Sequence, residues 1–329
     1  AQCLVGSEMC IRDRYQGDAE KWLKLAYGLK ARYTMHLLKR SANKDADMEK
    51  VLEYVNNSFE SAEEQAAFDV YDANNINPLY GFFVARAGLG ASESMRSKLA
   101  EYNDPRLSRA FITKQGTSGK EQAPGTADNA VYAPNGTPEQ GTSKYGTSLF
   151  MYSISAPTLL LSYHELKFLE AEALCRLERD AKSALKDAVV AGLLNAENSF
   201  TISRKELGKT LINAASSITE AEAESYFDNT IEAKYTAEPL KTTMTQKYFA
   251  LWGASGEATE SYNDVRRMKG LGENFIELKN PNSFPLRCPY GNSDTTTNAE
   301  VKAAYGNGQY VYSENVWWAG AVSYTHLRA

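Results

Sequence analysis

The sequence predicts a mostly α-helical protein that is built from helix pairs and interrupted by long irregular inserts. Apolar residues recur at steps of three and four in several segments, which is the spacing of one face of an α-helix. These segments come in pairs, and the short link Ser41–Asp45 joins the members of the first pair. Residues 58–157 differ, because Gly, Asn, Pro, Ser and Thr are frequent there and few helical stripes survive.

Three helix pairs are expected along the chain. Their predicted ranges are 18–40 with 46–57, 162–178 with 181–195, and 219–235 with 239–253. In the first helix, Trp22, Leu29 and Leu37 mark the apolar stripe. Shorter helices are expected over 92–102 and 257–268. Helix pairs of this length resemble tetratricopeptide units, which stack to bury a shared core, although the inserts rule out a regular solenoid.

Local signals indicate where several helices begin. Ser162 with Glu165, and Thr219 with Glu222, match the capping box in which a hydroxyl residue is followed three positions later by Glu. Pro239 suits the first turn of the next helix, because a residue there has no helical partner for its amide. These signals support the prediction of the second and third helix pairs.

The composition indicates a globular chain. Hydrophobic residues make up 43% of the 329 residues and charged residues 23%, close to the average for soluble globular proteins. The formal net charge is −5 with no dominant basic patch, which argues against nucleic acid as a partner. No apolar run is long enough to cross a bilayer. The 20 Tyr residues outnumber the 12 Phe, and Tyr suits wet binding surfaces because it combines an apolar face with a polar tip.

Both ends of the chain look foreign to the rest. Residues 1–14 and 321–329 resemble translated adapter sequence, so we expect them to be non-native. We therefore place a single domain at 15–320, with 58–157 as a loop-rich insert within it.

Outside residues 1–14, the chain has two cysteines, and they predict no metal or redox site. Cys175 and Cys288 are far apart in sequence and match neither a zinc pattern nor a redox motif. Cys175 is expected to be a small buried hydrophobic residue. A disulfide between Cys175 and Cys288 remains an alternative. We expect neither a metal nor a cofactor.

Motifs that would indicate catalysis are incomplete. The run 116–120 resembles the end of a phosphate-binding loop, but Glu121 follows where Ser or Thr is required. His164 begins a pattern typical of metalloproteases, yet Phe168 stands in place of the second His, so we expect His164 to be a partly exposed helix residue. No residue is predicted to be catalytic.

The acidic residues favour structural roles. Glu170 and Glu172 are two apart on a predicted helix and point to different faces, which suits a solvated face or salt links to Lys167 or Arg176. Asp264, next to Arg266 and Arg267, predicts a structural ion-pair cluster.

The insert supplies side chains that suit sugars. Sugars present flat C–H faces that stack on aromatic rings, and rims of hydroxyl groups that bond to Asn, Asp, Arg and Tyr. The candidates for ligand contact are Asn77, Tyr80, Phe82, Arg86, Tyr132, Tyr145 and Tyr152. The alternative for each ring is that it packs the insert onto the helices. We therefore favour binding over catalysis.

The stretch 279–298 differs in composition from the predicted helices. Its three prolines argue against a regular helix or a central strand. Phe284, Leu286 and Tyr290 are too apolar for a solvated tail. We expect a shaped coil that braces the helices, with Arg287 satisfying backbone or carboxylate groups.

This stretch resembles the C-terminal signature of the SusD/RagB family, which are cell-surface nutrient-binding lipoproteins of Bacteroidetes. The matching positions are Pro281, Phe284, Pro285, Arg287, Tyr290 and Asn298, whereas Gly291 replaces the usual second proline. Five further segments resemble family motifs in the same order along the chain. They are Trp22–Leu38, Asn77–Tyr80, Asn103–Leu107, Tyr163–Ala173 and Gln246–Arg267. Six ordered matches are specific, although each alone is weak.

The resemblance implies a SusD-like α/α superhelix that binds a glycan or another nutrient without catalysis. It implies delivery of that nutrient to a TonB-dependent, SusC-like transporter of the outer membrane. It also implies a place at the cell surface, with a lipid anchor in an N-terminal part that we expect this fragment to lack. In the family, the ligand face lies on loops opposite the repeat-like helices.

Two other functions stay open. The helix pairs alone would suit an intracellular helical-repeat adaptor that binds protein partners. A surface glycosidase would need a pair of Asp or Glu side chains flanking the bond to be cleaved, and no candidate pair stands out.

Overall fold

A computed structural model describes residues 14–86, 89–115, 121–124, 131–136, 144–212, 214–253, 256–280, 283–308 and 310–316. The side chains of residues 86, 113–115 and 121–124 lie outside this description. The chain forms two compact units, residues 1–277 and residues 278–329. The domain limits 15–320 stay a prediction. The expected non-native ends lie almost wholly outside the described residues.

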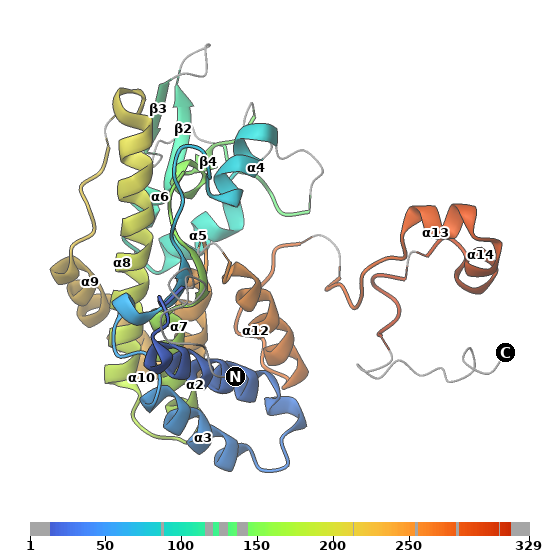
Figure 1. The fold of residues 1–329 in the computed structure, drawn as a ribbon, viewed down its shortest axis with the longest axis horizontal. Helices are drawn as coiled ribbons and strands as arrows, with labels where there is room; N and C mark the ends of the chain where they lie inside the picture. The colour runs from blue at the N-terminus through green and yellow to red at the C-terminus, as the bar shows by residue number, and fades with distance from the viewer. Residues whose placement is uncertain are drawn as a thin grey trace. The chain divides into compact units, whose positions relative to one another are not determined.

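Helices dominate the first unit (Figure 1). Its α-helices are α2 (Ala19–His36), α3 (Lys44–Asn56), α4 (Pro78–Arg86), α5 (Glu93–Glu101), α6 (Leu107–Ala110), α7 (Tyr163–Arg176), α8 (Lys182–Leu207), α9 (Glu220–Tyr226), α10 (Glu232–Ala237), α11 (Pro239–Ala250) and α12 (Ala258–Gly270). The π-helical turn η5 (Phe227–Ile231) joins α9 to α10. Single 3-10 turns are η1 (Leu38–Arg40), η2 (Ala62–Glu64), η3 (Leu149–Tyr152) and η4 (Gly208–Thr210). The mostly α-helical fold class is confirmed.

Two small antiparallel sheets, which were not predicted, organise the insert. β1 (Ala66–Phe68) pairs with β5 (Thr158–Leu161). β2 (Phe111–Gln115) lies between β3 (Glu121–Pro124) and β4 (Thr147–Ser148). Because β1 and β5 stand near the two ends of the 58–157 insert, their pairing ties the insert together at its base.

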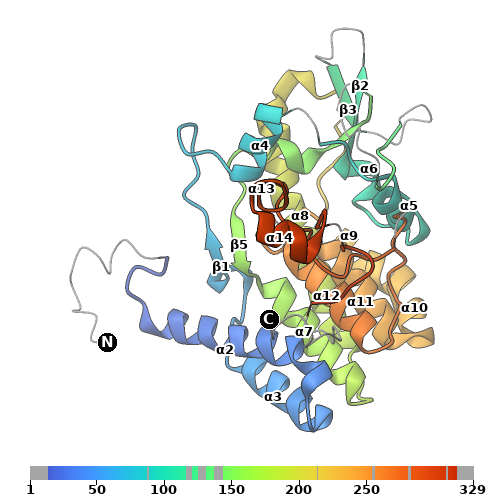
Figure 2. The same ribbon diagram turned by 90° about the vertical axis from the view of Figure 1, so that its right-hand side faces the viewer.

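The predicted helix pairs are present. α2 packs on α3, α7 on α8, and α10 on α11, while α3 and α11 also pack on α7. Helix α7 therefore lies at the centre of the stack. Two views place the α2–α3 pair at one end of the first unit and the β2–β3 hairpin at the other (Figure 1, Figure 2).

The predicted caps form. Ser162 Oγ accepts a hydrogen bond from the Glu165 amide at 3.1 Å, and Thr219 Oγ1 accepts one from the Glu222 amide at 3.2 Å. At α7 the second half of the capping box is replaced, because the Glu165 carboxylate binds Arg32 of α2 instead of the Ser162 amide. The start of α7 is thereby attached to α2.

Two large apolar clusters make up most of the core among the described residues of the first unit. The larger one packs α7, α8 and α11 against the inner side of the insert and contains Phe168, Phe200 and Phe249. The smaller one packs α2 and α3 onto α7 around Met35 and Met48. The side chains named here are at most 1% exposed.

Buried ion pairs also connect the helices. Arg267 of α12 donates to both carboxylate oxygens of Glu172 at 2.5 and 2.8 Å and to Asp264 at 2.8 Å. Arg176 donates to Glu172 at 2.7 Å. The predicted ion-pair role of Asp264 and the predicted salt link of Glu172 are confirmed, and a solvated face for Glu172 is excluded by its burial.

The second unit contains α13 (Asn292–Thr297) and α14 (Ala299–Tyr305). Helix α13 corrects the expectation that 279–298 avoids regular helix, because its residues follow the last proline and carry no barrier to helix formation. Residues 283–290 are a coil, and the Leu286 amide donates to the Val311 carbonyl at 2.8 Å. The expectation that residues 279–298 brace the helices of the first unit stays a prediction.

Cys175 and Cys288 are both free. Cys175 is half-buried, with its sulfur 3.6 Å from Thr243 Oγ1. Within the described ranges, no group of His, Cys, Asp or Glu is placed to hold a metal ion. No helix in that part of the chain has the length and apolar character to cross a membrane.

Candidate functional site

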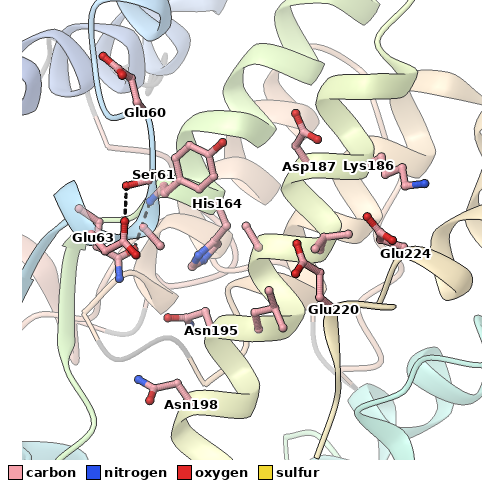
Figure 3. Close-up of a pocket in the computed structure, with 16 residues that line it drawn as sticks. Glu60, Ser61, Glu63, His164, Lys186, Asp187, Asn195, Asn198, Glu220 and Glu224 are labelled. Atoms are coloured by element: carbon pink, nitrogen blue, oxygen red, sulfur yellow. Dashed lines mark hydrogen bonds between the residues drawn. The ribbon is translucent and has the colours of Figure 1, made fainter. Parts of the chain in front are cut away.

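An open cavity of about 750 Å³ lies beside α8 (Figure 3). Its walls come from segment 60–65, the first residues of α7, one face of α8, and α9. Because α7 and α9 both pack on α8, the fold brings these distant segments together. The volume is within the range of roughly 300–1,000 Å³ that is typical of small-molecule sites.

The α8 wall is a single face of the helix. Its members recur at steps of three and four, and they are Lys186, Asp187, Val190, Ala191, Leu194, Asn195 and Asn198. The opposite face of α8 is buried in the larger core cluster. The Asn195 and Asn198 side chains form no hydrogen bond to any described residue, so both amides are available to a ligand. The wall therefore combines an aliphatic surface with open amide groups.

The facing wall is fixed by local hydrogen bonds. Ser61 Oγ donates to Glu63 Oε2 at 2.9 Å, and the Tyr163 amide donates to Gln65 Oε1 at 3.3 Å (Figure 3). Tyr163 is half-buried, and burial raises the pKa of its hydroxyl. The phenol therefore stays protonated at neutral pH and can donate a hydrogen bond from the cavity wall.

His164 lies at the floor of the cavity and is only 1% exposed, which corrects the expectation of a partly exposed residue. The correction arises because Glu257, the residue directly before α12, lies against the start of α7. Burial lowers the pKa of His164 to about 4, so the ring is neutral at pH 7. His164 Nε2 lies 3.8 Å from Glu257 Oε2, and neither atom has a hydrogen-bond partner among the described residues.

Glu257 is held beneath His164 by α2 and α7. Its Oε1 accepts from the Ser162 amide at 2.5 Å and from Arg32 at 3.4 Å. Burial, followed by the proximity of Glu165, raises the pKa of Glu257 well above its usual range. This polar cluster faces the interior, so we assign it to the support of the cavity floor.

Carboxylates dominate the rest of the lining. They belong to Glu60, Glu63, Asp187, Glu220 and Glu224. Among the described lining residues, Lys186 is the one Lys or Arg, and its Nζ is bound to both oxygens of Asp228 at 2.9 Å.

The arrangement suits the binding of a polar ligand with apolar faces. Val190, Leu194 and the Tyr163 ring supply apolar surface, and Asn195 and Asn198 supply donors and acceptors beside it. Saccharides have this combination of C–H faces and hydroxyl rims.

Three of the predicted contact residues are buried and serve the fold instead. Asn77 is 2% exposed, and its side chain donates to the Ala156 carbonyl at 2.7 Å and accepts from the Leu79 amide at 2.8 Å. Tyr132 and Tyr145 are 3% and 6% exposed. In this structure the three side chains serve capping and packing, and their contact with a ligand stays a prediction.

Three of the other four predicted residues have described side chains. Phe82 is 52% exposed, and the Tyr80 hydroxyl lies 3.4 Å from Glu206 Oε1. The Tyr152 ring meets Phe83 edge-on, with ring centroids 5.1 Å apart. The Arg86 side chain lies outside the described residues. Contact of these four with a ligand stays a prediction, and none of the seven is among the described residues that line the cavity.

The cavity was not predicted from the sequence. Its clearest signal is the second face of α8, on which Leu194 and Asn198 are exposed and follow Val190 at helical spacing, while Val190 also packs against the edge of the larger core cluster. The predicted end of this helix at 195 cut that stripe short, and the other walls come from distant segments.

Comparison with known proteins finds relatives over most of the chain. The profile of a SusD-like family, described as starch-binding and associating with the outer membrane, matches residues 14–290. No curated protein matches the chain at a significant level.

Several solved structures are similar. A SusD/RagB family protein from Bacteroides thetaiotaomicron is 65% identical, with a TM-score of 0.85 over 94% of this chain and 66% of its own. A SusD homologue from Bacteroides fragilis is 20% identical, with a TM-score of 0.66 over 92% and 68% of the two chains. A chitin-binding protein is 19% identical, with a TM-score of 0.62 over 93% and 66%. The last two show the fold alone, and this chain spans about two thirds of the length of each relative.

Proposed function

This chain belongs to the SusD-like family, whose members are non-catalytic binding proteins of the outer membrane, and from that premise we propose that it binds a saccharide nutrient in the α8 cavity. The nutrient would be released unchanged to a TonB-dependent transporter. The full-length protein would be held at the cell surface by a lipid anchor. The fragment status of this chain belongs to the same proposal.

The observation that carries the proposal is the pairing of aliphatic surface and unengaged amides on one face of α8. Asn195 and Asn198 are one turn apart and reach the same cavity beside Leu194. Asn195 is half-buried and Asn198 is exposed, so both amides can reach a ligand in the cavity. Amides beside aliphatic surface in a cavity of this volume suit a ligand with many hydroxyl groups.

The relatives support a saccharide as the ligand class. The family description names starch, and one solved relative of the same fold is a chitin-binding protein. Neither sugar is thereby assigned to this chain. The exposed ring of Phe82 and the Tyr80 hydroxyl on the insert would offer a second contact surface for a long oligosaccharide.

Calorimetric titration with a panel of neutral oligosaccharides tests the proposal. The double variant Asn195→Ala with Asn198→Ala should bind the best ligand at least about tenfold more weakly, because two hydrogen bonds contribute about 1 kcal/mol each. The matched control is Asn56→Ala, which removes an exposed amide at the end of α3 that does not line the cavity.

Unchanged affinity in the double variant would exclude the cavity as the ligand site. The absence of binding to every oligosaccharide, in a protein that unfolds cooperatively, would contradict the proposed ligand class. Co-purification of the full-length protein with a transporter encoded next to its gene tests the delivery step separately.

A further inference from the structure

We propose that Glu257 keeps its proton at neutral pH and donates a hydrogen bond to His164 Nε2, so that a neutral acid–imidazole pair, sensitive to alkali, forms the floor beneath the α8 cavity. His164 is among the residues that line the cavity (Figure 3). The pair links α7 to the residue directly before α12, and each member is only 1% exposed. It would be present whether or not a saccharide occupies the cavity.

Two buried atoms on this floor lack a hydrogen-bond partner. His164 Nε2 and Glu257 Oε2 lie 3.8 Å apart, and neither forms a hydrogen bond to any described residue. Such atoms are rare in protein interiors, because each one has given up its bonds to water. A neutral ring and an ionised carboxylate present two acceptors and leave both atoms unpaired. With a proton on Oε2, a movement of about 1 Å would bring the two atoms to hydrogen-bond distance.

The hydrogen bonds of Glu257 distinguish its two oxygens. Oε1 accepts from the Ser162 amide at 2.5 Å and lies 3.4 Å from Arg32 Nη2. Oε1 thus acts as the carbonyl oxygen of the group, and Oε2 is left to carry the hydrogen. A protonated carboxyl group has this division between one acceptor and one donor. Because Nε2 must then accept, the ring hydrogen of neutral His164 is assigned to Nδ1.

The charges around Glu257 include one carboxylate too many. Arg32 binds Glu165 through two of its nitrogens, and its contact with Glu257 is the longer one. These three side chains are at most 6% exposed. If both carboxylates were ionised, a single guanidinium would leave a buried negative charge uncompensated. Protein interiors avoid this cost by keeping one such group protonated.

The other charged groups described in this region have partners of their own. They form the pairs Lys247–Asp264, Arg106–Asp104 and His36–Glu260, at 2.8, 2.6 and 2.8 Å. Burial, followed by the nearby carboxylate of Glu165, raises the pKa of Glu257 well above its usual range, whereas burial lowers the pKa of His164 to about 4. The proton therefore belongs to the carboxyl group and not to the ring.

Infrared difference spectroscopy detects this proton directly. The carbonyl stretch of a protonated carboxyl group lies at a higher frequency than the amide and carboxylate bands. The spectrum of the wild type minus that of Glu257→Gln should contain this band at neutral pH. The control Glu260→Gln should leave the band in place, because the hydrogen bond to His36 outweighs burial and lowers the pKa of Glu260 to about 2. Absence of the band from the wild type would overturn the proposal.

Nitrogen NMR of isotope-labelled histidine tests the other half of the pair. The signals that disappear in His164→Gln identify the buried ring. We expect a neutral ring with its hydrogen on Nδ1, and the same tautomer in Glu257→Gln, since the Gln amide can donate to Nε2 in place of the acid. A hydrogen on Nε2 at neutral pH would overturn the hydrogen bond between Glu257 and His164.

Thermal unfolding at several pH values tests whether Glu257 stays neutral. Because its pKa is raised in the folded state, its contribution to stability is fully present below about pH 4.5 and is lost as the pH rises through the folded value. Glu257→Gln keeps the neutral shape and cannot ionise. Its melting temperature should therefore equal or exceed that of the wild type at neutral pH, and the difference should grow in alkali.

Glu172→Gln is the matched substitution at a buried carboxylate that has two cations of its own. Glu172 is 0% exposed and accepts from Arg267 and Arg176. Glu172→Gln should lower the melting temperature by more than about 6 °C, because it leaves buried guanidinium groups without their counter-ion. If Glu257→Gln lowered it as far, or failed to fold, Glu257 would be an ionised partner of Arg32, and the proposal would be overturned.

Discussion

His164 shows how burial sets the chemistry of one residue. The ring lies between the cavity and the buried groups Glu165, Glu257 and Arg32, and Lys247 and Arg106 add positive charge nearby. In this environment a second positive charge would be poorly solvated, so the folded protein keeps the ring neutral. Sequence inspection could locate the helix that carries His164 but not the chain segment that covers it.

Acid should therefore destabilise the fold through His164. Its pKa is about 4 in the folded state, against about 6.5 in an unfolded chain. Because the unfolded state binds the proton more tightly, the free energy of unfolding is fully retained above about pH 6.5 and falls as the pH drops toward 4. The contribution of His164 to this fall is up to about 3 kcal/mol. Urea unfolding at about pH 7 and about pH 4.5 measures it.

The matched variant is His164→Gln, which carries no titrating ring. Its free energy of unfolding should depend less on pH than that of the wild type, by about 2 kcal/mol over the same interval. Glu165 and Glu257 remain in both proteins, so the comparison isolates the imidazole. Parallel pH dependence in the two proteins would show that the ring is not buried in neutral form.

Arg106 should be a strong single contributor to stability. Its side chain donates to Asp104 at 2.8 and 2.6 Å and to the Phe249 carbonyl at 2.7 Å, and it is 2% exposed. Arg106→Met leaves the Asp104 carboxylate buried without its counter-ion and should lower the free energy of unfolding by about 3–5 kcal/mol. Urea titration monitored by circular dichroism measures the change.

An exposed pair provides the control for Arg106. Arg179 forms an ion pair with Glu49 at the surface, so Arg179→Met should cost less than about 1 kcal/mol. Similar losses in the two variants would contradict the distinction between buried and exposed pairs. The sequence shows the Asp-Pro-Arg motif that contains Arg106. It does not show that α11 will cover it.

At the scale of elements, helix α8 marks the limit of local sequence signals. The predicted helix stops at 195, whereas α8 continues to Leu207. The added residues include Ser199, Thr201 and Ser203, whose helix propensity is low. Tertiary contacts stabilise them instead: Ser203 Oγ donates to the Leu149 carbonyl at 2.7 Å, and Phe200 is buried. The caps of α7 and α9 depend on neighbouring residues, and for that reason they were predictable.

The contact between α8 and α11 depends on a glycine. A Cβ atom on Gly192 would lie 2.9 Å from the Cβ of Ala250, which is fixed to the α11 backbone. Gly192→Ala should therefore push the helices apart and cost about 1–3 kcal/mol, which exceeds the gain of about 1 kcal/mol in helix propensity. Thermal unfolding measures the balance.

Gly270 at the end of α12 gives the matched substitution. There a Cβ would lie 3.0 Å from the Cδ of Lys39, a flexible side chain that can move away. Gly270→Ala should therefore leave the melting temperature unchanged or raise it slightly. If Gly192→Ala behaved in the same way, the close approach of α8 and α11 would not limit the fold.

At the scale of the whole molecule, helix pairing could be predicted, but assembly of the site could not. Periodicity reports which face of each helix is apolar, and stacking follows from that. The cavity depends on how four segments spanning residues 60–224 come together, and no local pattern records that arrangement. The aromatic residues of the insert illustrate the same limit. Tyr132 and Tyr145 are of a residue type that is common on binding surfaces, yet both are buried.

The partition of the molecule predicts that the first unit folds by itself. Both apolar clusters are made of residues 15–271, so residues 14–277 contain the described core and the walls of the cavity. A chain of residues 14–277 should unfold cooperatively, with a melting temperature within about 5 °C of the whole chain, since about 1 kcal/mol corresponds to about 2–4 °C at this size. It should also bind oligosaccharides with unchanged affinity. Calorimetry and ligand titration on both chains provide the measurements. A broad transition without cooperativity, or a drop well beyond 5 °C, would show that residues 278–316 stabilise the helices as the predicted brace requires.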